Sequence, residues 1–454
     1  MRTFVRCGQV FTGREDDARA DEILVFDERG VLDYVGPEAG SPRRVRGDRA
    51  LDYSRYFVMP GLIDVHTHLA YGNAKSEEDI DLYSPLEFRT LRGMFFAQKV
   101  AAAGFTAICS PGDAGQISLS IRNAIRAGLF DGPRVMAAGR YLTTHQGLTD
   151  WYPTWIGAPE TSIGKLVTNI AEAVEEIRRQ VKDGVDCIKI ALDGIQRRDN
   201  GELVAAFTQE ETDIMVREIH RLGKKAIAHA RGREATLYAA RAGIDLIFHA
   251  DHLDNECIEA MLQTGSMISP TLTHPRNTID FTQPHEPAYL KGRPGHAQRE
   301  YEIGCGNWKK ARAAGVPILT GTDTGFAVTP YGEWNARELD LFVEDLDLSP
   351  AAALRAATEV NARFMTGGDR IGVLEPGRAA DFVVLEGSPL TDIGVLQDRS
   401  RIRGVYIAGR EIRIPERDYD PRQVTDFALS NWTDLYTRAR VAELRLPTPR
   451  LAAE

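Results

Sequence analysis

The sequence predicts an α/β protein: a (β/α)8 barrel of the TIM type with a small β-sandwich domain formed by the N- and C-terminal segments. Apolar segments of strand length recur through the middle of the chain, and segments of helical period separate most of them. The two ends instead alternate polar and apolar residues between frequent turns, as antiparallel strands do. One α/β barrel takes about 250 residues, so a chain of 454 residues has room for both parts.

Eight apolar segments are the expected barrel strands. They are residues 61–66, 105–109, 134–139, 185–190, 225–229, 245–249, 267–272 and 317–323. Continuous apolar runs are typical of strands buried on both faces, as in a parallel sheet covered by helices. Amphipathic segments such as 170–182, 208–222 and 307–314 lie between them, and glycines such as Gly184 and Gly315 mark helix ends. A doubly wound open sheet is the alternative, but it does not require eight units.

Changes in the pattern of polar and apolar residues divide the chain into three parts. Residues 1–58 and 368–415 are expected to form the β-sandwich, and residues 59–367 the barrel. Residues 416–454 read as a polar tail with a helix near 423–444, whose aromatic residues predict docking on the body or on another subunit. The connection from 273 to about 300 is rich in Pro and His and lacks periodicity, so we expect a lid or a disordered loop there.

Composition narrows the classes of partner. The chain has 55 Lys+Arg and 65 Asp+Glu, a formal net charge of −10, which gives no electrostatic reason to expect nucleic acid or anionic lipid. No apolar run reaches the roughly 18 residues of a membrane span. The five cysteines form no CxxC pair, so neither a disulfide framework nor a thiolate zinc site is expected. We therefore expect a cytoplasmic protein that acts on a small molecule.

Four of only ten histidines fall at the carboxyl ends of predicted strands. His66 and His68 are two residues apart in an extended segment, so both imidazoles point the same way. Taken alone, such a pair is more often two surface histidines. However, His229, His249 and Asp323 end other predicted strands, on the face where barrel enzymes carry their active sites. Imidazole and carboxylate are ligands of zinc, so the sequence predicts a metal site.

Lys189 lies near the end of the fourth predicted strand. An ammonium group has no lone pair and cannot bind a cation. One interpretation is a lysine that extends its ammonium group to solvent or pairs with Asp186 or Asp193. The other is an amine carboxylated by carbon dioxide, which becomes an anion able to bridge two ions. The residues alone do not choose between these interpretations.

Several segments together resemble the amidohydrolase superfamily. They are VMPGLIDVHTHLA, the Lys in CIKIALDG, the His in AIAHARG, the His in LIFHADHLD, the Asp in ILTGTDTG and the closing LEPGRAADFVVL. The chain most resembles the branch with imidazolonepropionase-like proteins and binuclear metallo-dipeptidases of the prolidase type. The resemblance extends from the N-terminal strands to about Gly409.

The resemblance implies a centre with two divalent ions, expected to be Zn²⁺. His66, His68 and Asp323 would bind one ion, and His229 and His249 the other. An N6-carboxylysine at Lys189 would bridge them. The resemblance also implies a homo-oligomer.

The predicted reaction is hydrolysis of a C–N bond by a hydroxide that bridges the two ions, with Asp323 moving the proton to the leaving nitrogen. Expected substrates are a dipeptide, an N-acyl amino acid, or an aryl amide or carbamate. Related mononuclear deaminases place a Glu three residues after the fifth-strand His, where this chain has Gly232. An imidazolonepropionase-like enzyme that opens a cyclic amide is the first alternative. A non-catalytic assembly protein on the same barrel is the second.

Four further residues are predicted to act on the substrate. His145 lies where related dipeptidases carry a His that contacts the substrate carbonyl, or else it is a solvent-facing loop residue. Arg231 points to the same side as His229 and could hold a substrate carboxylate, or it pairs with Glu234. Trp151 and its aromatic neighbours suit an apolar wall or simple packing. His252 is expected to line the pocket.

Overall fold

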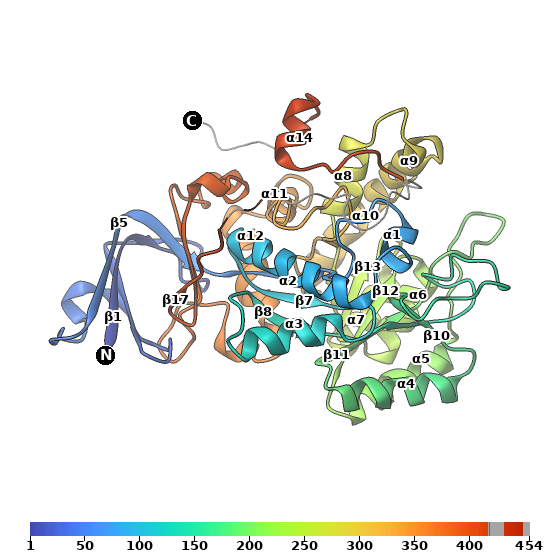
Figure 1. The fold of residues 1–454 in the computed structure, drawn as a ribbon, viewed down its shortest axis with the longest axis horizontal. Helices are drawn as coiled ribbons and strands as arrows, with labels where there is room; N and C mark the ends of the chain where they lie inside the picture. The colour runs from blue at the N-terminus through green and yellow to red at the C-terminus, as the bar shows by residue number, and fades with distance from the viewer. Residues whose placement is uncertain (416, 418–430, 448–454) are drawn as a thin grey trace.

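One sheet joins the two ends of the chain in the computed structural model, which describes residues 1–415, 417 and 431–447 (Figure 1). Its strand order is β17-β16-β15-β5-β1-β3-β4, with β2 paired to β1. The bounds are β1 Arg2–Val10, β2 Arg19–Ala20, β3 Glu22–Asp27, β4 Leu32–Pro37, β5 Arg49–Pro60, β15 Phe382–Leu385, β16 Ile402–Ile407 and β17 Arg410–Glu411. The antiparallel pair β5–β15 brings the ends together as the sequence predicts. Their arrangement as a two-layered sandwich stays a prediction.

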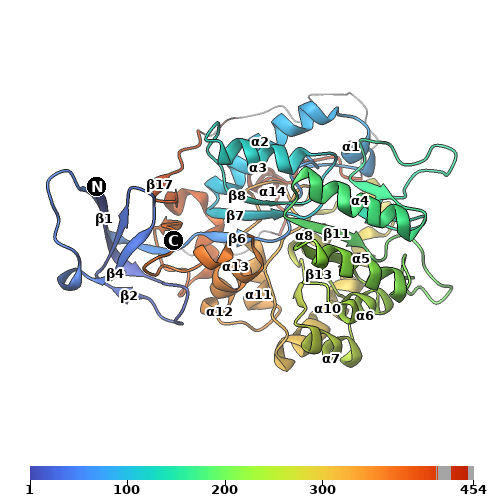
Figure 2. The ribbon, with the colours of Figure 1, turned by 90° about the horizontal axis from the view of Figure 1, so that it is seen from below.

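The larger body contains short parallel strands covered by helices (Figure 2). β6 Leu62–Asp64, β7 Phe105–Ser110 and β8 Arg134–Ala137 pair in that order. A second sheet has the order β10-β9-β11-β12-β13-β14, with β9 Tyr141–Thr143, β10 Gly164–Leu166, β11 Cys187–Ala191, β12 Lys225–Ala230, β13 Leu246–His249 and β14 Met267–Ser269. Every residue of β7, β11 and β13 is buried, as the apolar runs predict.

Backbone hydrogen bonds connect the two parallel sheets at both sides. On one side, Asp186 N at the start of β11 donates to Ala137 O at the end of β8, at 2.8 Å. On the other side lies the predicted eighth strand, 317–323, which makes only isolated bridges, at Ile318 with β14 and at Thr324 with Thr67. The expected regular strand is wrong for this segment, because Thr320 N and Thr322 N donate to the side chains of Asn361 and Asp64 and not to a neighbouring strand.

Helices follow most of the strands. They are α1 Glu77–Asp81, α2 Leu86–Ala102, α3 Ile117–Arg126, α4 Ile170–Asp183, α5 Gln209–Arg221, α6 Arg233–Ala242, α7 Asn255–Thr264, α8 Thr273–Phe281, α9 Pro287–Leu290, α10 Arg293–Ala314, α11 Arg337–Glu344, α12 Pro350–Arg355, α13 Asn361–Phe364 and α14 Arg438–Glu443. A π-helical segment, Ala356–Val360, connects α12 with α13. The predicted helix ends are confirmed at Gly184 and Gly315, which adopt φ +95° and +101°.

The connection from 273 to 300 is largely helical, so the expectation of a loop without regular structure is wrong, and its role as a lid stays a prediction. α8, α9 and the start of α10 occupy it. The sequence shows only the last part of α10 as periodic, because Gly295, Gly304 and Gly306 interrupt its pattern and lower its helix propensity. At Gly304 a Cβ would lie 2.4 Å from the ring of Trp308, so close packing requires this glycine.

The described part of the tail, residues 431–447, packs on the body. Trp432 and Tyr436 are buried against Phe281 and Trp334. Trp334 Nε1 donates to Tyr436 O at 2.8 Å, and Tyr436 N donates to Ala327 O at 3.1 Å. This confirms the docking predicted from the aromatic residues. The helix expected near 423–444 is observed only as α14; its part at 423–430 lies outside the described residues.

Glu286 binds the 431–447 segment to the body through several hydrogen bonds. Loss of its carboxylate is expected to weaken this packing. The buried carboxylate accepts from Thr433 N at 2.8 Å, from Thr433 Oγ1 at 3.0 Å and from the Tyr436 hydroxyl. Glu286→Ala leaves these donors unpaired and should lower the free energy of unfolding by about 2 kcal/mol. Urea denaturation measures the change. Glu443→Ala, which removes an exposed carboxylate paired with Arg440, should change it by less than about 0.5 kcal/mol; equal effects would contradict this role for Glu286.

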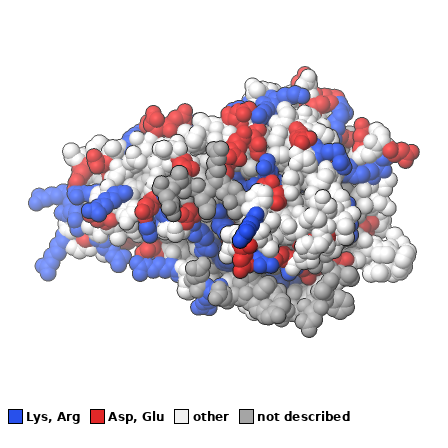
Figure 3. All heavy atoms as spheres, turned by 90° about the horizontal axis from the view of Figure 1, so that it is seen from above, with Lys and Arg blue, Asp and Glu red and all other residues white. Residues whose placement is uncertain are grey.

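Charge is unevenly distributed over the surface. Figure 3 shows Lys and Arg side chains gathered at the end of the molecule that holds the N-terminal sheet. Exposed arginines there are Arg43, Arg44, Arg46, Arg49 and Arg55. This end is locally basic although the chain carries a net charge of −10. Among the described residues, no helix is both long and apolar enough to cross a bilayer.

Candidate metal centre

The predicted ligands lie where strands end. His229 is the second-last residue of β12, His249 is the last residue of β13, and His66 follows β6 by two residues. His249 and Asp323 adopt φ +70° and +55°, a left-handed conformation that costs energy for residues other than glycine. Such strain is typical of functional sites. Here the left-handed conformation turns the backbone at His249 and at Asp323, so that each of these side chains faces the other predicted ligands.

His66, His68 and Asp323 form one compact group. His66 Nε2 and His68 Nε2 are 3.1 Å apart. Asp323 Oδ1 lies 3.4 Å from His66 Nε2 and 3.3 Å from His68 Nε2. Gly321 permits this approach, because a Cβ there would lie 2.8 Å from the Cβ of His66.

Partners on the far side of each ring fix how the two imidazoles present their nitrogens. His68 Nδ1 donates to the carbonyl of Gly112 at 2.7 Å. The hydroxyl of Thr271 donates to Ser269 O, so it accepts from His66 Nδ1 at 3.2 Å. Both Nε2 atoms therefore carry lone pairs and face each other, an arrangement that repels unless a cation lies between them.

His229 and His249 form the second part of the cluster. Their ring centroids are 4.6 Å apart, and the ring of His249 is 5.5 Å from that of His66. One ligand atom each of His66, His249 and Asp323 can be chosen so that all lie within 4.8 Å of one another. His249 Nδ1 is buried and has no hydrogen-bond partner among the described residues. The structure thus brings both predicted pairs of histidines to one place.

Lys189 completes the group from β11. Its Nζ is buried and lies 3.5 Å from His66 Nε2, above the rings of Phe248 and Tyr141. The simple ion-pair interpretation is wrong, because Asp186 pairs with Arg122 at 2.6 Å and Asp193 Oδ2 accepts from backbone amides instead. Burial lowers the pKa of Lys189 to about 8.

The donor set fits a cation. Burial lowers the pKa of His66 and of His249 well below the usual value, so both imidazoles are neutral and keep their lone pairs. Burial opposes the ionisation of Asp323, and a cation bound beside its Oδ1 would favour the carboxylate. Neutral imidazoles around a carboxylate are the ligands that zinc accepts.

Three residues of the site were not predicted from the sequence as parts of it. Asp64 Oδ1 accepts from His66 N at 2.9 Å, and Thr271 orients the ring of the same histidine. Asp193 Oδ1 lies 3.4 Å from His229 Nε2. The sequence pattern could have identified Asp64, because it lies two residues before His66 on the same side of an extended segment. No local pattern identifies Asp193 or Thr271, because only tertiary folding brings them next to the histidines.

Gly232 leaves no room for the glutamate of a deaminase. A Cβ there would lie 2.9 Å from Leu203 Cβ and 3.3 Å from Asp193 Oδ2. Contacts below about 3.4 Å require a neighbour to move, and here both neighbours belong to a packed segment. The structure therefore gives a physical reason for the residue type at this position.

The predicted substrate-binding residues lie in different surroundings. Arg231 Nη1 pairs with the buried Asp251 at 2.6 Å, so the alternative pair with Glu234 is wrong. His145 is exposed over 57% of its side chain, with Nδ1 3.6 Å from Asp150. Trp151 is half-buried, and its Nε1 has no partner among the described residues. The roles of Arg231, His145 and Trp151 on a substrate stay predictions.

Trp155 lies at the surface, whereas His274 is packed beside another aromatic side chain. Trp155 is 85% exposed, so it does not belong to an apolar wall. His274 begins α8 and packs edge-on against Phe326, with its Nε2 buried and unpartnered among the described residues. His274 therefore lies with the aromatic residues beside the loop that follows Asp323.

His252, in the connection between β13 and α7, pairs with Glu300 of α10. Its Nε2 is 2.8 Å from Glu300 Oε2, and this hydrogen bond raises the pKa of His252. The pair therefore stabilises the fold fully below about pH 6.5, and this contribution is lost as pH rises through the raised pKa.

Glu300→Gln should return the pKa of His252 toward its ordinary value. An NMR titration of the imidazole measures it; an unchanged midpoint would contradict the pairing.

With this geometry in view, we compared the chain with known proteins. The model of the amidohydrolase family matches residues 57–412. The chain belongs to the amidohydrolase family. This match includes every predicted metal ligand.

Relatives of this amidohydrolase include hydrolases with different names. Ochratoxinase of Aspergillus niger is 28% identical over 435 residues, which cover 91% of this chain and 87% of that protein. Imidazolonepropionase of Solibacter usitatus is 24% identical over 419 residues, 84% of this chain and 88% of that protein. The structure of a Xaa-Pro dipeptidase with bound methionine superposes with a TM-score of 0.78 at 26% identity, covering 90% of this chain and 99% of that one. This amidohydrolase is therefore an enzyme that hydrolyses C–N bonds.

Proposed function

We propose that this amidohydrolase is a binuclear metal-dependent hydrolase that cleaves the amide bond of a small molecule: a dipeptide, an N-acyl amino acid, or an aryl amide or carbamate. The convergence of six predicted ligands, His66, His68, Lys189, His229, His249 and Asp323, supports the proposal most strongly. Similarity to a Xaa-Pro dipeptidase supports an amide substrate. We also propose that the eight strand segments close into a (β/α)8 barrel, because the 317–324 segment bonds to both β14 and the residues after β6.

His66, His68 and Asp323 would hold one divalent ion, and His229 and His249 the other. Ions bound there would polarise a carbonyl oxygen and lower the pKa of a water molecule. We propose zinc, since imidazole nitrogen and carboxylate oxygen make up the donor set.

Lys189 is proposed to carry a carboxylate. A neutral amine adds carbon dioxide: its nitrogen forms a bond to the carbon, and a proton leaves, so the product is a carbamate anion. The low pKa of Lys189, about 8, supplies this neutral amine near neutral pH. A negative group at this position also removes the repulsion between a buried ammonium and bound cations.

Asp323 is proposed to move the proton. Its Oδ1 faces the imidazoles of His66 and His68, and an ion held there would keep the carboxyl ionised and able to accept. Having accepted a proton from the attacking water, it would donate that proton to the leaving nitrogen.

The test combines metal content with activity. Purified chain incubated with zinc and bicarbonate should contain two ions per chain and hydrolyse at least one member of a panel of dipeptides, N-acyl amino acids and aryl amides or carbamates. A chelator should abolish turnover, and zinc should restore it. One ion per chain with opening of a cyclic imidazolone would favour the second candidate, which the imidazolonepropionase relative supports. Absence of hydrolysis across the panel would contradict the proposal.

A further inference from the structure

Asp323 is the most exposed of the six predicted metal ligands. Solvent reaches 13% of its side chain, whereas the other five ligands are buried. A substrate must approach the ions where the protein leaves a ligand accessible. The exposure therefore indicates that the substrate approaches the histidine cluster on the side of Asp323.

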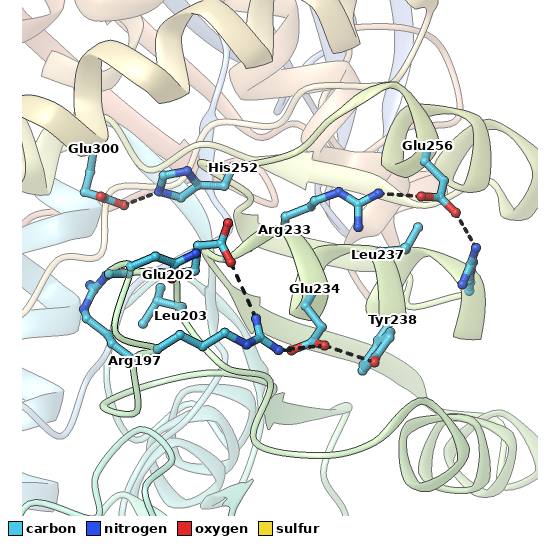
Figure 4. A pocket seen from close by; sticks show the side chains of 15 residues that line it. Arg197, Glu202, Leu203, Arg233, Glu234, Leu237, Tyr238, His252, Glu256 and Glu300 are labelled. Carbon is cyan, nitrogen blue, oxygen red and sulfur yellow. Dashed lines mark hydrogen bonds and ion pairs between the residues drawn. The ribbon is translucent and has the colours of Figure 1, made fainter.

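The pocket of about 840 Å³ along α6 does not open onto this cluster (Figure 4). None of the predicted metal ligands lines it. Gly232 and Leu203 of its lining, with Asp193 behind them, separate it from His229. Figure 4 shows charged side chains of the lining in ion pairs with one another, and Arg197 donates to a backbone carbonyl. This pocket is therefore not the route to the ions.

Three aromatic side chains, Tyr71, Phe326 and His274, form a row that begins at a predicted ligand. The ring of Tyr71 stacks on the ring of His68, with centroids 4.2 Å apart and an angle of 8° between the planes. Phe326 packs edge-on against Tyr71 at 5.0 Å, and His274 packs edge-on against Phe326 at 4.8 Å. The aromatic row is therefore in direct contact with the metal centre, with no layer of residues between them.

The outer part of the aromatic row lies beside the accessible ligand. Phe326 follows Asp323 by three residues. Gly325 between them packs closely on the row, because a Cβ there would lie 2.9 Å from the Cβ of Tyr71. Tyr71 is buried, whereas Phe326 and His274 are only half-buried. Asp323, Phe326 and His274 thus form the partly exposed edge of the site.

This edge offers an uncharged aromatic surface. Phe326 carries no polar group. Burial lowers the pKa of His274 to about 4, so its imidazole is neutral near pH 7. Aromatic rings pack favourably on one another edge-on or with an offset, as the members of the row already do. The exposed parts of these rings therefore suit an aromatic group of the substrate.

The role of Asp323 indicates which half of the substrate meets this surface. A group that donates a proton must lie within hydrogen-bond reach of the atom that accepts it. Because Asp323 is proposed to protonate the leaving nitrogen, that nitrogen lies next to its carboxyl. The group carried by the leaving nitrogen then lies on the side of Asp323 that Phe326 and His274 border.

We propose that Phe326, held between Tyr71 and His274, is the specificity-determining residue for an aromatic group on the leaving amine. The preferred substrates are then N-acyl aromatic amino acids, dipeptides with a C-terminal aromatic residue, and anilides. This inference rests on the proposed amide hydrolase function and narrows its substrate class. In the alternative, Phe326 only packs the loop after Asp323 and does not distinguish one substrate from another.

Matched substrates test this preference. N-acetylphenylalanine, N-acetylcyclohexylalanine and N-acetylalanine share their acyl group and carboxylate and differ only in the side chain on the leaving amine. With the zinc- and bicarbonate-loaded protein, kcat/KM for the first should be at least about tenfold above that for the third and about threefold above that for the second. Phe326→Ala should bring both ratios near one. Phe326→Leu, which keeps an apolar contact, should remove only the preference for phenylalanine over cyclohexylalanine.

Phe130→Leu is the matched control. Phe130 is an exposed phenylalanine that precedes β8, at the end of the strands opposite to the predicted ligands, so both ratios should stay at their wild-type values. A wild-type ratio near one between phenylalanine and alanine substrates would overturn the inference. So would an equal loss of kcat/KM for all three substrates in Phe326→Leu, because a residue that only packs the loop affects every substrate alike.

Binding of the released amines separates this inference from the proposed function. In calorimetry on the zinc-loaded protein, phenylalanine should bind about tenfold more tightly than alanine, and Phe326→Ala should remove the difference. If the wild-type protein hydrolyses no amide, the proposed function fails, and this experiment still decides whether Phe326 selects an aromatic amine. If amides are hydrolysed but the two amines bind equally, the proposed function stands and the inference is overturned.

Discussion

Asp323→Asn should reduce kcat for amide hydrolysis by about 10²–10⁴-fold, the usual contribution of a positioned proton-transfer group. Asparagine has the same size and tolerates the left-handed backbone, φ +55°, that this position requires. It lacks the charge that faces His66 and His68 at 3.3–3.4 Å. The substitution therefore removes the proton acceptor while it preserves the local backbone.

Asp347→Asn is the matched control. Asp347 also adopts φ +55°, but its side chain is 66% exposed and pairs with Lys309 at the surface. Metal analysis and circular dichroism should accompany the rate measurement, so that loss of an ion is distinguished from loss of proton transfer. If Asp323→Asn kept more than a tenth of the wild-type kcat, the proposed proton transfer would be wrong.

Lys189→Ala should lower both activity and metal content. Removing one partner of a buried charge cluster costs about 3–5 kcal/mol, which corresponds to roughly 10²–10⁴-fold in rate or affinity. Small carboxylates such as acetate should restore part of the activity, because the truncated side chain leaves space for an anion where the carbamate would lie.

Two measurements make this test specific for a carbamate. Wild-type protein incubated with ¹³C-bicarbonate should show a carbamate carbon by NMR that Lys189→Ala lacks. Lys225→Ala, at the start of β12, removes a lysine whose Nζ donates to Arg363 O far along the strand from His229. It should keep its activity. A labelled carbamate in Lys189→Ala, or full activity without the lysine, would contradict the assignment.

Much of the site was predictable because it depends on local patterns. Buried parallel strands have continuous apolar sequences, and a ligand at the carboxyl end of such a strand is recognised by its position alone. His66, His229 and His249 were found in this way, and the structure gathers them. The eighth segment was found by the same pattern, but it is not a regular strand, because Thr320 N and Thr322 N donate to the side chains of Asn361 and Asp64, which the local pattern does not contain.

Helix α10 shows where pattern recognition fails. Its glycines lower the intrinsic preference for a helix, so only the segment 307–314 reads as periodic. Tertiary packing overcomes this preference: Trp308 is buried and its Nε1 donates to the carbonyl of His249 at 2.7 Å. The same helix thus supports one of the predicted metal ligands, a link that no local sequence pattern contains.

The sequence by itself determined the strands, the residues that end them and hence the type of chemistry, because hydrophobic period and residue type are properties of neighbouring positions. Only the tertiary structure decided which charges meet. Asp251 rather than Glu234 neutralises Arg231, and Arg197 is left without a carboxylate. The physical reason is that ion pairs act over a few ångströms in space, and residues distant in the chain reach that distance only after the strands and helices have packed.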